Sequence, residues 1–177
     1  MKKLKKYSIG IFGGSFDPPH YGHLKISIAG IKKLKLDKVI WLVTEKNPLK
    51  NKTFFSLKTR IKKCRKIIKN KKKINILFIE KKIKSKRIID SIIYLKKKSK
   101  TTDFYLLLGS DNLINFHKWN GWKKITKLTT LAIFSRKGYD NKINKTKVLK
   151  FLDKKRIIFI KNKKIDISST KIRKNLI

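Results

Sequence analysis

Six short apolar runs recur along this 177-residue chain, and segments with a helical period separate them. The runs are rich in Ile, Leu, Val and Phe and hardly alternate with polar residues, which is typical of strands buried on both faces of a sheet. Such strands need a layer of helices on each face, so this feature limits the fold more than any other. We expect strands over residues 7–12, 39–43, 74–79, 104–109, 131–134 and 156–160.

Between these runs, apolar residues recur at spacings of three and four, which is the pattern of a helix with one buried face. The stripes comprise Leu24, Ile28, Ile31 and Leu34, then Leu57, Ile61, Cys64 and Ile68, then Ile88, Ile92 and Leu95. Strand and helix in alternation favour right-handed crossovers. The sequence therefore predicts an α/β fold, a single doubly wound (Rossmann-like) domain over residues 1–177 with a mostly parallel sheet and helices on both faces.

The formal net charge of +40 raises the question of a nucleic-acid partner. The basic residues are 44 Lys against 6 Arg, they are spread over nearly the whole chain, and only two alanines occur. Specific recognition of phosphates and guanine favours Arg, whereas abundant Lys and Ile with little Ala is typical of A/T-rich codons. We expect compositional drift, with non-specific adhesion to polyanions such as RNA or DNA but no specific nucleic-acid partner.

No run approaches the roughly 18 apolar residues that a membrane span requires, so no membrane partner is expected. The basic start at residues 1–10 lacks a following apolar region that ends in small residues, so it does not resemble a signal peptide. The single cysteine, Cys64, permits no internal disulfide, which agrees with a reducing compartment. We expect a cytoplasmic protein, and the sequence makes no prediction of its oligomeric state.

In a doubly wound sheet, ligands bind beyond the carboxyl ends of the strands, near the point where the strand order reverses. The loop after the first strand reads GGSFDPPHYGH and contains no lysine. Gly13 and Gly14 allow the backbone to approach a ligand closely, and Ser15 offers a hydroxyl to a phosphate oxygen. The sequence predicts that this loop forms part of the active site.

A helix is expected to begin near Tyr21, with its free N–H groups directed at the loop. His20 and His23 are three residues apart, so both rings reach the same small volume at this helix start. We favour phosphate binding for the pair. A zinc site is a weaker alternative because the chain has only three His and no other His or Cys lies nearby, and a structural role is a third possibility.

Two motifs carry a resemblance to a known family. The H-x-G-H element, here His20-Tyr21-Gly22-His23, resembles the signature of a nucleotidyltransferase superfamily and also recurs with variation in class I aminoacyl-tRNA synthetases. The segment ISSTKIR at 167–173 is similar to the I-S-S-T-x-I-R motif of bacterial nicotinate-mononucleotide adenylyltransferases. Pantetheine-phosphate adenylyltransferases share the first motif, usually as T-N-G-H, but have a different element near the C-terminus.

The resemblance implies an enzyme that joins the AMP moiety of ATP to nicotinate mononucleotide, giving nicotinate adenine dinucleotide and pyrophosphate in NAD biosynthesis. The alternatives are transfer to another phosphorylated acceptor, such as nicotinamide mononucleotide or pantetheine phosphate, and a non-enzymatic polyanion-binding protein. Mg²⁺ would be bound mainly through ATP, with no protein metal ligand. Phosphoryl-type transfer of this kind needs positioned donors and cations and no covalent enzyme intermediate.

Residue roles follow from the resemblance. It implies catalytic roles for His20 and His23 on the α-phosphate. Contacts to ATP are expected from Gly13, Gly14, Ser15, Phe16, His20, His23, Gly109, Asp111, Ser168, Ser169, Thr170 and Arg173. Contacts to the nicotinate nucleotide are expected from Trp119, Arg136, Ile88 and Lys50.

Some of these residues also have structural interpretations. Asp111 could cap the next helix, and Trp119 or Trp122 could be a core or lid aromatic. His117 is read as a surface residue, and Asp17 as an organiser of the turn. Relatives usually have S-Y-T where this chain has Lys86-Arg87-Ile88, in a segment that helps to hold the nicotinate end partly through backbone groups.

Overall fold

The computed structural model describes residues 6–46, 52–136, 138–162 and 167–176. These residues form one six-stranded sheet in which every pair of neighbouring strands is parallel. The strands are β1 (Ser8–Gly14), β2 (Lys38–Val43), β3 (Ile74–Leu77), β4 (Asp103–Gly109), β5 (Thr130–Phe134) and β6 (Ile157–Ile160). The predicted α/β fold with a Rossmann-like parallel sheet is confirmed.

The strand order across the sheet is β3-β2-β1-β4-β5-β6. The chain therefore builds outward from β1 on one side, crosses back after β3, and builds outward again from β4 on the other side. The order reverses between β1 and β4, which pair through Ser8 to Ile11 and Asp103 to Leu106. This reversal is the place where a doubly wound sheet opens a crevice for a ligand.

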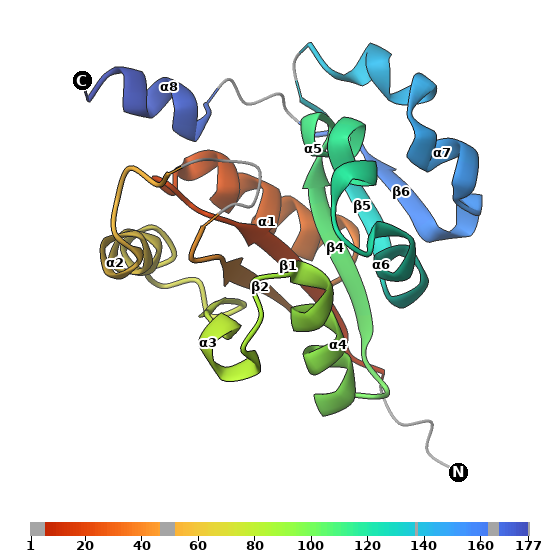
Figure 1. Ribbon diagram of the computed structural model, residues 1–177, viewed down its shortest axis with the longest axis horizontal. Helices are drawn as coiled ribbons and strands as arrows, with labels where there is room; N and C mark the ends of the chain where they lie inside the picture. The colour runs from red at the N-terminus through yellow and green to blue at the C-terminus, as the bar shows by residue number, and fades with distance from the viewer. Residues whose placement is uncertain (1–5, 47–51, 137, 163–166, 177) are drawn as a thin grey trace.

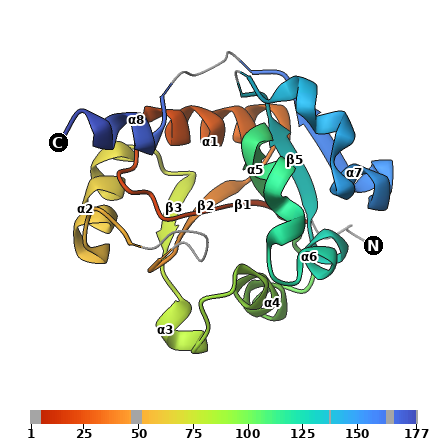
Figure 2. The same ribbon diagram turned by 45° about the horizontal axis from the view of Figure 1, so that its top comes forward.

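Helices cover both faces of the sheet, and Figure 2 shows the first and fourth of them on opposite sides. The helices are α1 (Tyr21–Lys33), α2 (Leu57–Ile67), α3 (Glu80–Ile83), α4 (Ile88–Lys98), α5 (Ser110–Asn115), α6 (Trp122–Leu128), α7 (Lys147–Phe151) and α8 (Ser169–Lys174). Short 3₁₀ turns lie at Phe116–Lys118, Asp140–Lys145 and Lys154–Arg156. None of the helices in the described ranges is long and apolar enough to cross a membrane.

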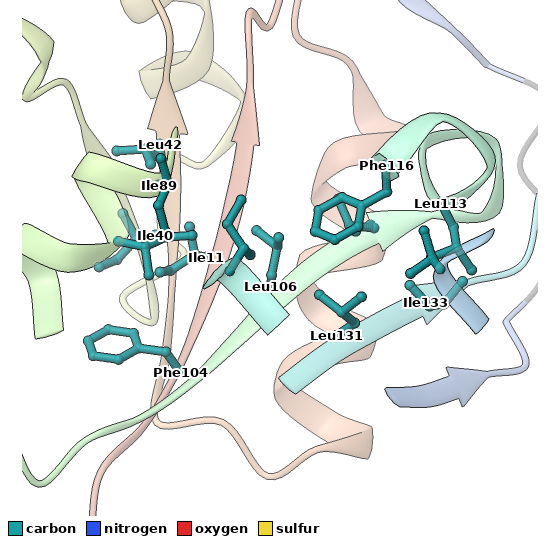
Figure 3. Close-up of a cluster of buried hydrophobic side chains, with 14 of the residues drawn as sticks. Ile11, Ile40, Leu42, Ile89, Phe104, Leu106, Leu113, Phe116, Leu131 and Ile133 are labelled. Carbon is teal, nitrogen blue, oxygen red and sulfur yellow. The ribbon is translucent and has the colours of Figure 1, made fainter. Parts of the chain in front are cut away.

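Two apolar clusters hold these layers together. On the α1 and α2 side, Leu24 and Cys64 pack with Trp41 and Phe134 of the sheet. On the other side, side chains of α4, α5 and α6 pack on the inner strands (Figure 3); the labelled residues are Ile11, Ile40, Leu42, Ile89, Phe104, Leu106, Leu113, Phe116, Leu131 and Ile133. Burial of each such side chain stabilises the fold by about 1.5–3 kcal/mol.

The sequence pattern predicted the bounds of all six strands to within two residues, and the three apolar stripes fall on α1, α2 and α4 or their C-caps. The third strand is shorter than the apolar run at 74–79, because β3 ends at Leu77 and Ile79 precedes the first turn of α3. Ile79 is nevertheless buried in the core cluster. The apolar run therefore predicted burial as far as Ile79, but the strand itself ends earlier because the chain turns into α3.

Candidate active site

A cleft of about 620 Å³ opens at the carboxyl ends of β1 and β4, where the strand order reverses. Gly13 and Gly14 end β1 on one wall, and Gly109 ends β4 on another. The predicted site residues that line it are Gly13, Gly14, Ser15, Phe16, His20, His23, Ile88, Gly109, Asp111, Trp119, Arg136, Ser168, Ser169 and Thr170. Residues from both ends of the chain therefore meet in one cavity.

The loop after β1 is held in a conformation that few side chains adopt. Phe16 has a φ of +49°, and a non-glycine residue keeps such a backbone only where its surroundings fix it. Its ring stacks on the fully buried Trp41, with centroids 4.9 Å apart and an interplanar angle of 14°. The same ring lies 4.9 Å from the imidazole of His23. This aromatic packing fixes both the loop and the second imidazole.

The two imidazoles at the start of α1 are each fixed by a hydrogen bond from a backbone N–H group. His20 caps the helix, since its Nδ1 accepts the N–H of Gly22 at 3.1 Å. The backbone N–H of His20 in turn donates to Nδ1 of His23 at 3.1 Å. The two ring centroids are 3.9 Å apart. Because each Nδ1 accepts a hydrogen bond, a neutral ring carries its proton on Nε2, which makes both Nε2 atoms hydrogen-bond donors.

The surroundings keep both imidazoles neutral. Burial, with the nearby charge of Arg136 as the second cause, lowers the pKa of His20 from 6.5 to about 4. Burial also lowers the pKa of His23 well below 6.5, and the neighbouring His20 and Arg136 lower it further. Both rings therefore offer an Nε2–H at neutral pH. Two neutral donors side by side suit a shared anionic guest.

The segment near the C-terminus joins this loop through side-chain hydrogen bonds. Ser168 caps α8 by accepting the N–H of Lys171, as expected for the start of a short helix. The hydroxyl of Ser169 donates to the carbonyl oxygen of Pro18 at 2.8 Å. In Figure 1, α8 lies beside the start of α1, although it is the last helix in the chain. The predicted convergence of the two motifs is therefore present in the geometry.

Arg173 differs from its neighbours in position. It is absent from the described residues that line the cleft. Its guanidinium donates instead to the carbonyl oxygen of Asp17 and to the hydroxyl of Thr170. The side chain thus ties α8 to the loop after β1, and a direct contact with the triphosphate stays a prediction.

The loops after β4 and β5 share an ion pair inside the cleft. Nη1 of Arg136 lies 2.7 Å from Oδ2 of Asp111, and the backbone N–H of Arg136 donates to the Ser110 hydroxyl at 3.0 Å. The other carboxylate oxygen of Asp111 is buried with no protein partner among the described residues. Gly109 caps α5 without a side-chain bond, so Asp111 is not the helix cap. Its free oxygen leaves an acceptor available to a ligand.

Basic and aromatic groups line the rest of the cleft. Ile88 begins α4, and its Cδ1 lies 2.7 Å from the position that a Cβ on Gly13 would take. Trp119 is half-buried and packs on Phe116 with ring centroids 5.2 Å apart. Lys86 lines the cleft and pairs with Glu45 at 2.9 Å. The predicted contact Lys50 lies outside the described residues.

Three other residues named in the sequence analysis, Asp17, Trp122 and His117, do not line the cleft. Asp17 is buried and its carboxylate accepts the N–H groups of Phe54 and Phe55, so it organises loops. Trp122 lies against the core, packed on Phe151 with centroids 5.0 Å apart, and does not line the cleft. His117, interpreted as a surface residue, is half-buried, and its Nδ1 is enclosed.

The sequence interpretation did not assign several residues that line the cleft. They include Thr44, Ser135 and Asn162, together with Lys118; Lys86 and Arg87, which also line the cleft, belong to the segment already expected to help hold the nicotinate end. Thr44 and Ser135 directly follow β2 and β5, so the rule that ligands bind at strand ends could have found them. Lys118 carried no usable signal in a chain with 44 lysines.

Comparison with known proteins agrees with this geometry. A family model described as cytidylyltransferase-like matches residues 11–175. The protein named "probable nicotinate-nucleotide adenylyltransferase" of Pelagibacter ubique is 46% identical over 170 residues, which cover 96% of this chain and 94% of that protein. The protein of the same name from a Ruegeria species is 37% identical over 131 residues, or 74% of this chain and 69% of its own length.

A solved structure of the Plasmodium falciparum nicotinic acid mononucleotide adenylyltransferase complexed with NaAD is similar in fold. It superposes with a TM-score of 0.75 at 25% identity, and the match covers 95% of this chain and 83% of that one. The same enzyme complexed with APC gives a TM-score of 0.74. Both motifs at the cleft fall inside the matched family model, so the chain belongs to the cytidylyltransferase-like family and, within it, to the nicotinate-nucleotide adenylyltransferases.

Proposed function

We propose that this protein transfers the AMP moiety of ATP to nicotinate mononucleotide, which gives nicotinate adenine dinucleotide and pyrophosphate. The observation that carries the proposal is the meeting of His20 and His23 with Ser168–Thr170 in one cleft at the switch point of the sheet. A dinucleotide product needs one cavity that holds two nucleotides end to end, and a volume of about 620 Å³ lies within the usual range of ligand sites.

The chemistry follows from the donors in the cleft. A phosphate oxygen of nicotinate mononucleotide attacks the α-phosphorus of ATP in line, and the bond from the α-phosphorus to the oxygen that bridges to the β-phosphate breaks as pyrophosphate leaves. Negative charge is then spread over the other oxygens of the α-phosphate. Neutral Nε2–H donors of His20 and His23 stabilise this charge in a prearranged site. No covalent intermediate on the protein is required.

The triphosphate would extend from the histidines toward α8. The hydroxyls of Ser168 and Thr170 and the first N–H groups of α8 would bind the β- and γ-phosphates, while the Ser169 hydroxyl holds the Pro18 carbonyl. Gly109 and Asp111 would hold the adenosine ribose, since the enclosed Asp111 Oδ1 can accept a hydrogen bond from a hydroxyl. Each of these roles is a proposal for the described geometry.

Mg²⁺ is proposed to enter the site with ATP. The described lining of the cleft consists mainly of hydrogen-bond donors and cations, and Asp111 already pairs with Arg136. Such a lining fits a metal ion that phosphate oxygens and water hold, because Mg²⁺ requires oxygen ligands and keeps several waters. When bound, Mg²⁺ would neutralise charge on the triphosphate and on the leaving pyrophosphate.

The acidic nucleotide is the favoured acceptor at the other end of the cleft. Trp119 offers a ring face for a pyridine, and Lys118 supplies positive charge to the same cavity, whereas Lys86 and Arg87 are paired with Glu45 and Asp90. Positive charge favours nicotinate over its neutral amide. Backbone N–H groups at the start of α4, beside Ile88, are further donors for a carboxylate.

A direct assay separates the candidate reactions. Purified protein is incubated with ATP, Mg²⁺ and one acceptor at a time, namely nicotinate mononucleotide, nicotinamide mononucleotide or pantetheine phosphate, and pyrophosphate release is measured. We expect the largest kcat/KM with nicotinate mononucleotide. If pyrophosphate is released faster with one of the other two acceptors, that compound is the substrate and the proposed acceptor is wrong. No release with all three would contradict an adenylyltransferase of this class.

A further inference from the structure

Arg60 of α2 is almost fully buried beneath the loop after β1, in a chain whose other cations are mostly exposed. Only 1% of its surface is accessible. A guanidinium carries its charge at all relevant pH values, so a buried one must be compensated by acceptors. The surrounding groups that do this identify what the residue holds in place.

Four backbone carbonyl oxygens from three segments accept its N–H groups. Nη1 donates to Ser15 at 2.6 Å and to Thr44 at 2.8 Å. Nη2 donates to Glu45 at 2.6 Å, and Nε donates to Phe55 at 3.1 Å. Ser15 and Thr44 both line the cleft, after β1 and β2 respectively. The Arg60 side chain therefore holds two loops that line the candidate site, although Arg60 itself does not line the cleft.

The bond to Ser15 has a direct geometric consequence. The peptide group is planar and trans, so the C=O of Ser15 and the N–H of Phe16 point in opposite directions. With the oxygen held by Arg60, the N–H of Phe16 is directed away from Arg60. Phe16 is also the residue with the strained φ of +49°. A strained backbone persists only where its neighbours overdetermine it, and the Arg60 contact is one of the bonds that do so.

Asp17, whose charge is opposite to that of Arg60, also helps to hold the loops after β1 and β2 together. Its carboxylate accepts the N–H groups of Phe54 and Phe55 at 2.7 and 2.9 Å, and Phe55 is also bonded to Arg60. Burial is the main influence that lowers the pKa of Arg60, and the nearby Asp17 charge opposes it. The loops after β1 and β2 are thus joined by two side chains that carry opposite charges.

We propose that Arg60 is a positioning residue for the adenylyl-transfer step. It touches neither substrate, but its bond to the Ser15 carbonyl orients the Ser15–Phe16 peptide so that this loop presents donors to the α-phosphate. The inference rests on the proposed function, since it assigns the loop to the reacting phosphate. A shift of about 1 Å in such a group can lower a rate a hundredfold, so the effect belongs in kcat.

The Arg60→Lys variant tests this role, because lysine keeps the charge but has one nitrogen in place of three. A single ammonium cannot reach carbonyls on opposite sides of a planar fork. We expect kcat to fall about tenfold to a hundredfold with a smaller change in the KM for ATP. Arg65→Lys makes the same change on the exposed face of α2 and is expected to match the wild type.

A second control separates positioning from general loosening of α2. Cys64 is buried on the same helix and bonds none of the four carbonyl groups, so Cys64→Ala weakens packing alone. Positioning predicts that Arg60→Lys loses far more kcat than Cys64→Ala at an equal drop in Tm. Equal losses of kcat, or a wild-type kcat in Arg60→Lys, would overturn the inference.

If Arg60→Lys does not fold, the wild-type protein still supplies a test. With ¹⁵N labelling of arginine, the Arg60 Nη–H signals should be resolved, as in a locked guanidinium, and should shift when a non-hydrolysable ATP analogue binds. A single averaged Nη–H signal for Arg60, or Arg60 signals that do not shift at a saturating concentration of the analogue, would contradict the proposal. Failure of the wild type to release pyrophosphate bears on the proposed function instead, and the analogue titration still decides the role of Arg60.

Discussion

Ser169 Oγ donates a 2.8 Å hydrogen bond to the carbonyl oxygen of Pro18, 151 residues earlier in the chain. The bond joins the first turn of α8 to the loop that precedes the histidine pair. Together with the contact of Arg173 to the Asp17 carbonyl, it places the two ends of the chain in one cleft.

Ser169→Ala removes this connection while the Ser168 cap of α8 remains. A net hydrogen bond contributes about 1 kcal/mol, which corresponds to about a fivefold rise in the KM for ATP. Steady-state kinetics at saturating nicotinate mononucleotide measure the change. Lys174→Ala, at the exposed end of the same helix, serves as the control and should leave KM unchanged. A wild-type KM in Ser169→Ala would show that the Ser169–Pro18 bond does not support ATP binding.

His20→Ala and His23→Ala each remove one Nε2–H donor from the cleft. Loss of one prearranged donor to a transition-state oxygen lowers kcat by about 10²–10³-fold. The exposed Lys25, one turn further along α1, gives the matched control Lys25→Ala. Circular dichroism checks that the variants remain folded. If either histidine variant retained kcat within threefold of the wild type, that ring would not act on the reacting phosphate.

The lowered pKa values predict how stability depends on pH. An unfolded chain binds a proton on each histidine near pH 6.5, whereas folded His20 does so only near pH 4. Between these values the unfolded state holds more protons, so the free energy of unfolding falls as the pH drops from about 6.5 toward 4. Urea unfolding at pH 7.5, 6 and 5 measures this fall. It should be smaller in the double variant His20→Gln with His23→Gln, and an equal fall in both proteins would contradict the assignment.

Gly109→Ala tests the close packing at the end of β4. A Cβ there would lie 2.4 Å from Oδ1 of Asp111, whose other oxygen is held by Arg136 at 2.7 Å. The carboxylate must move, so we expect the KM for ATP to rise about tenfold. Gly30→Ala on α1 meets its nearest neighbour at an ordinary 3.4 Å and should bind ATP normally. Equal KM values for the two variants would show that Asp111 does not contact the nucleotide.

The sequence located most of the fold because burial and periodicity are local properties. Val39 to Val43 form an unbroken apolar run, which is typical of a strand covered by helices on both faces of the sheet, and β2 lies there. The histidine pair could also be placed, because a strand end, two glycines and a helix start follow one another within the loop. In contrast, the ends of short runs depend on the next turn, which is why β3 stops at Leu77.

Residues that act through distant contacts could not be predicted in this way. Arg60 is held by four carbonyl groups from three segments, and a single sequence does not show which segments meet. Trp119 and Trp122 are equally aromatic, but only tertiary packing places the first in the cleft and the second against Phe151. Lys118 was hidden for a different reason, since a lysine carries little information in a chain so rich in them.

The central claim is that the histidine pair and the α8 segment bind one triphosphate. An NMR titration of the ¹⁵N-labelled protein with ATP and Mg²⁺ tests it most directly, by following the Nε2 signals of His20 and His23 together with the amide signals of Ser169 and Thr170. We predict that all four shift along a single binding curve with one Kd. Shifts confined to one of the two groups, or two groups with different Kd values, would contradict the claim.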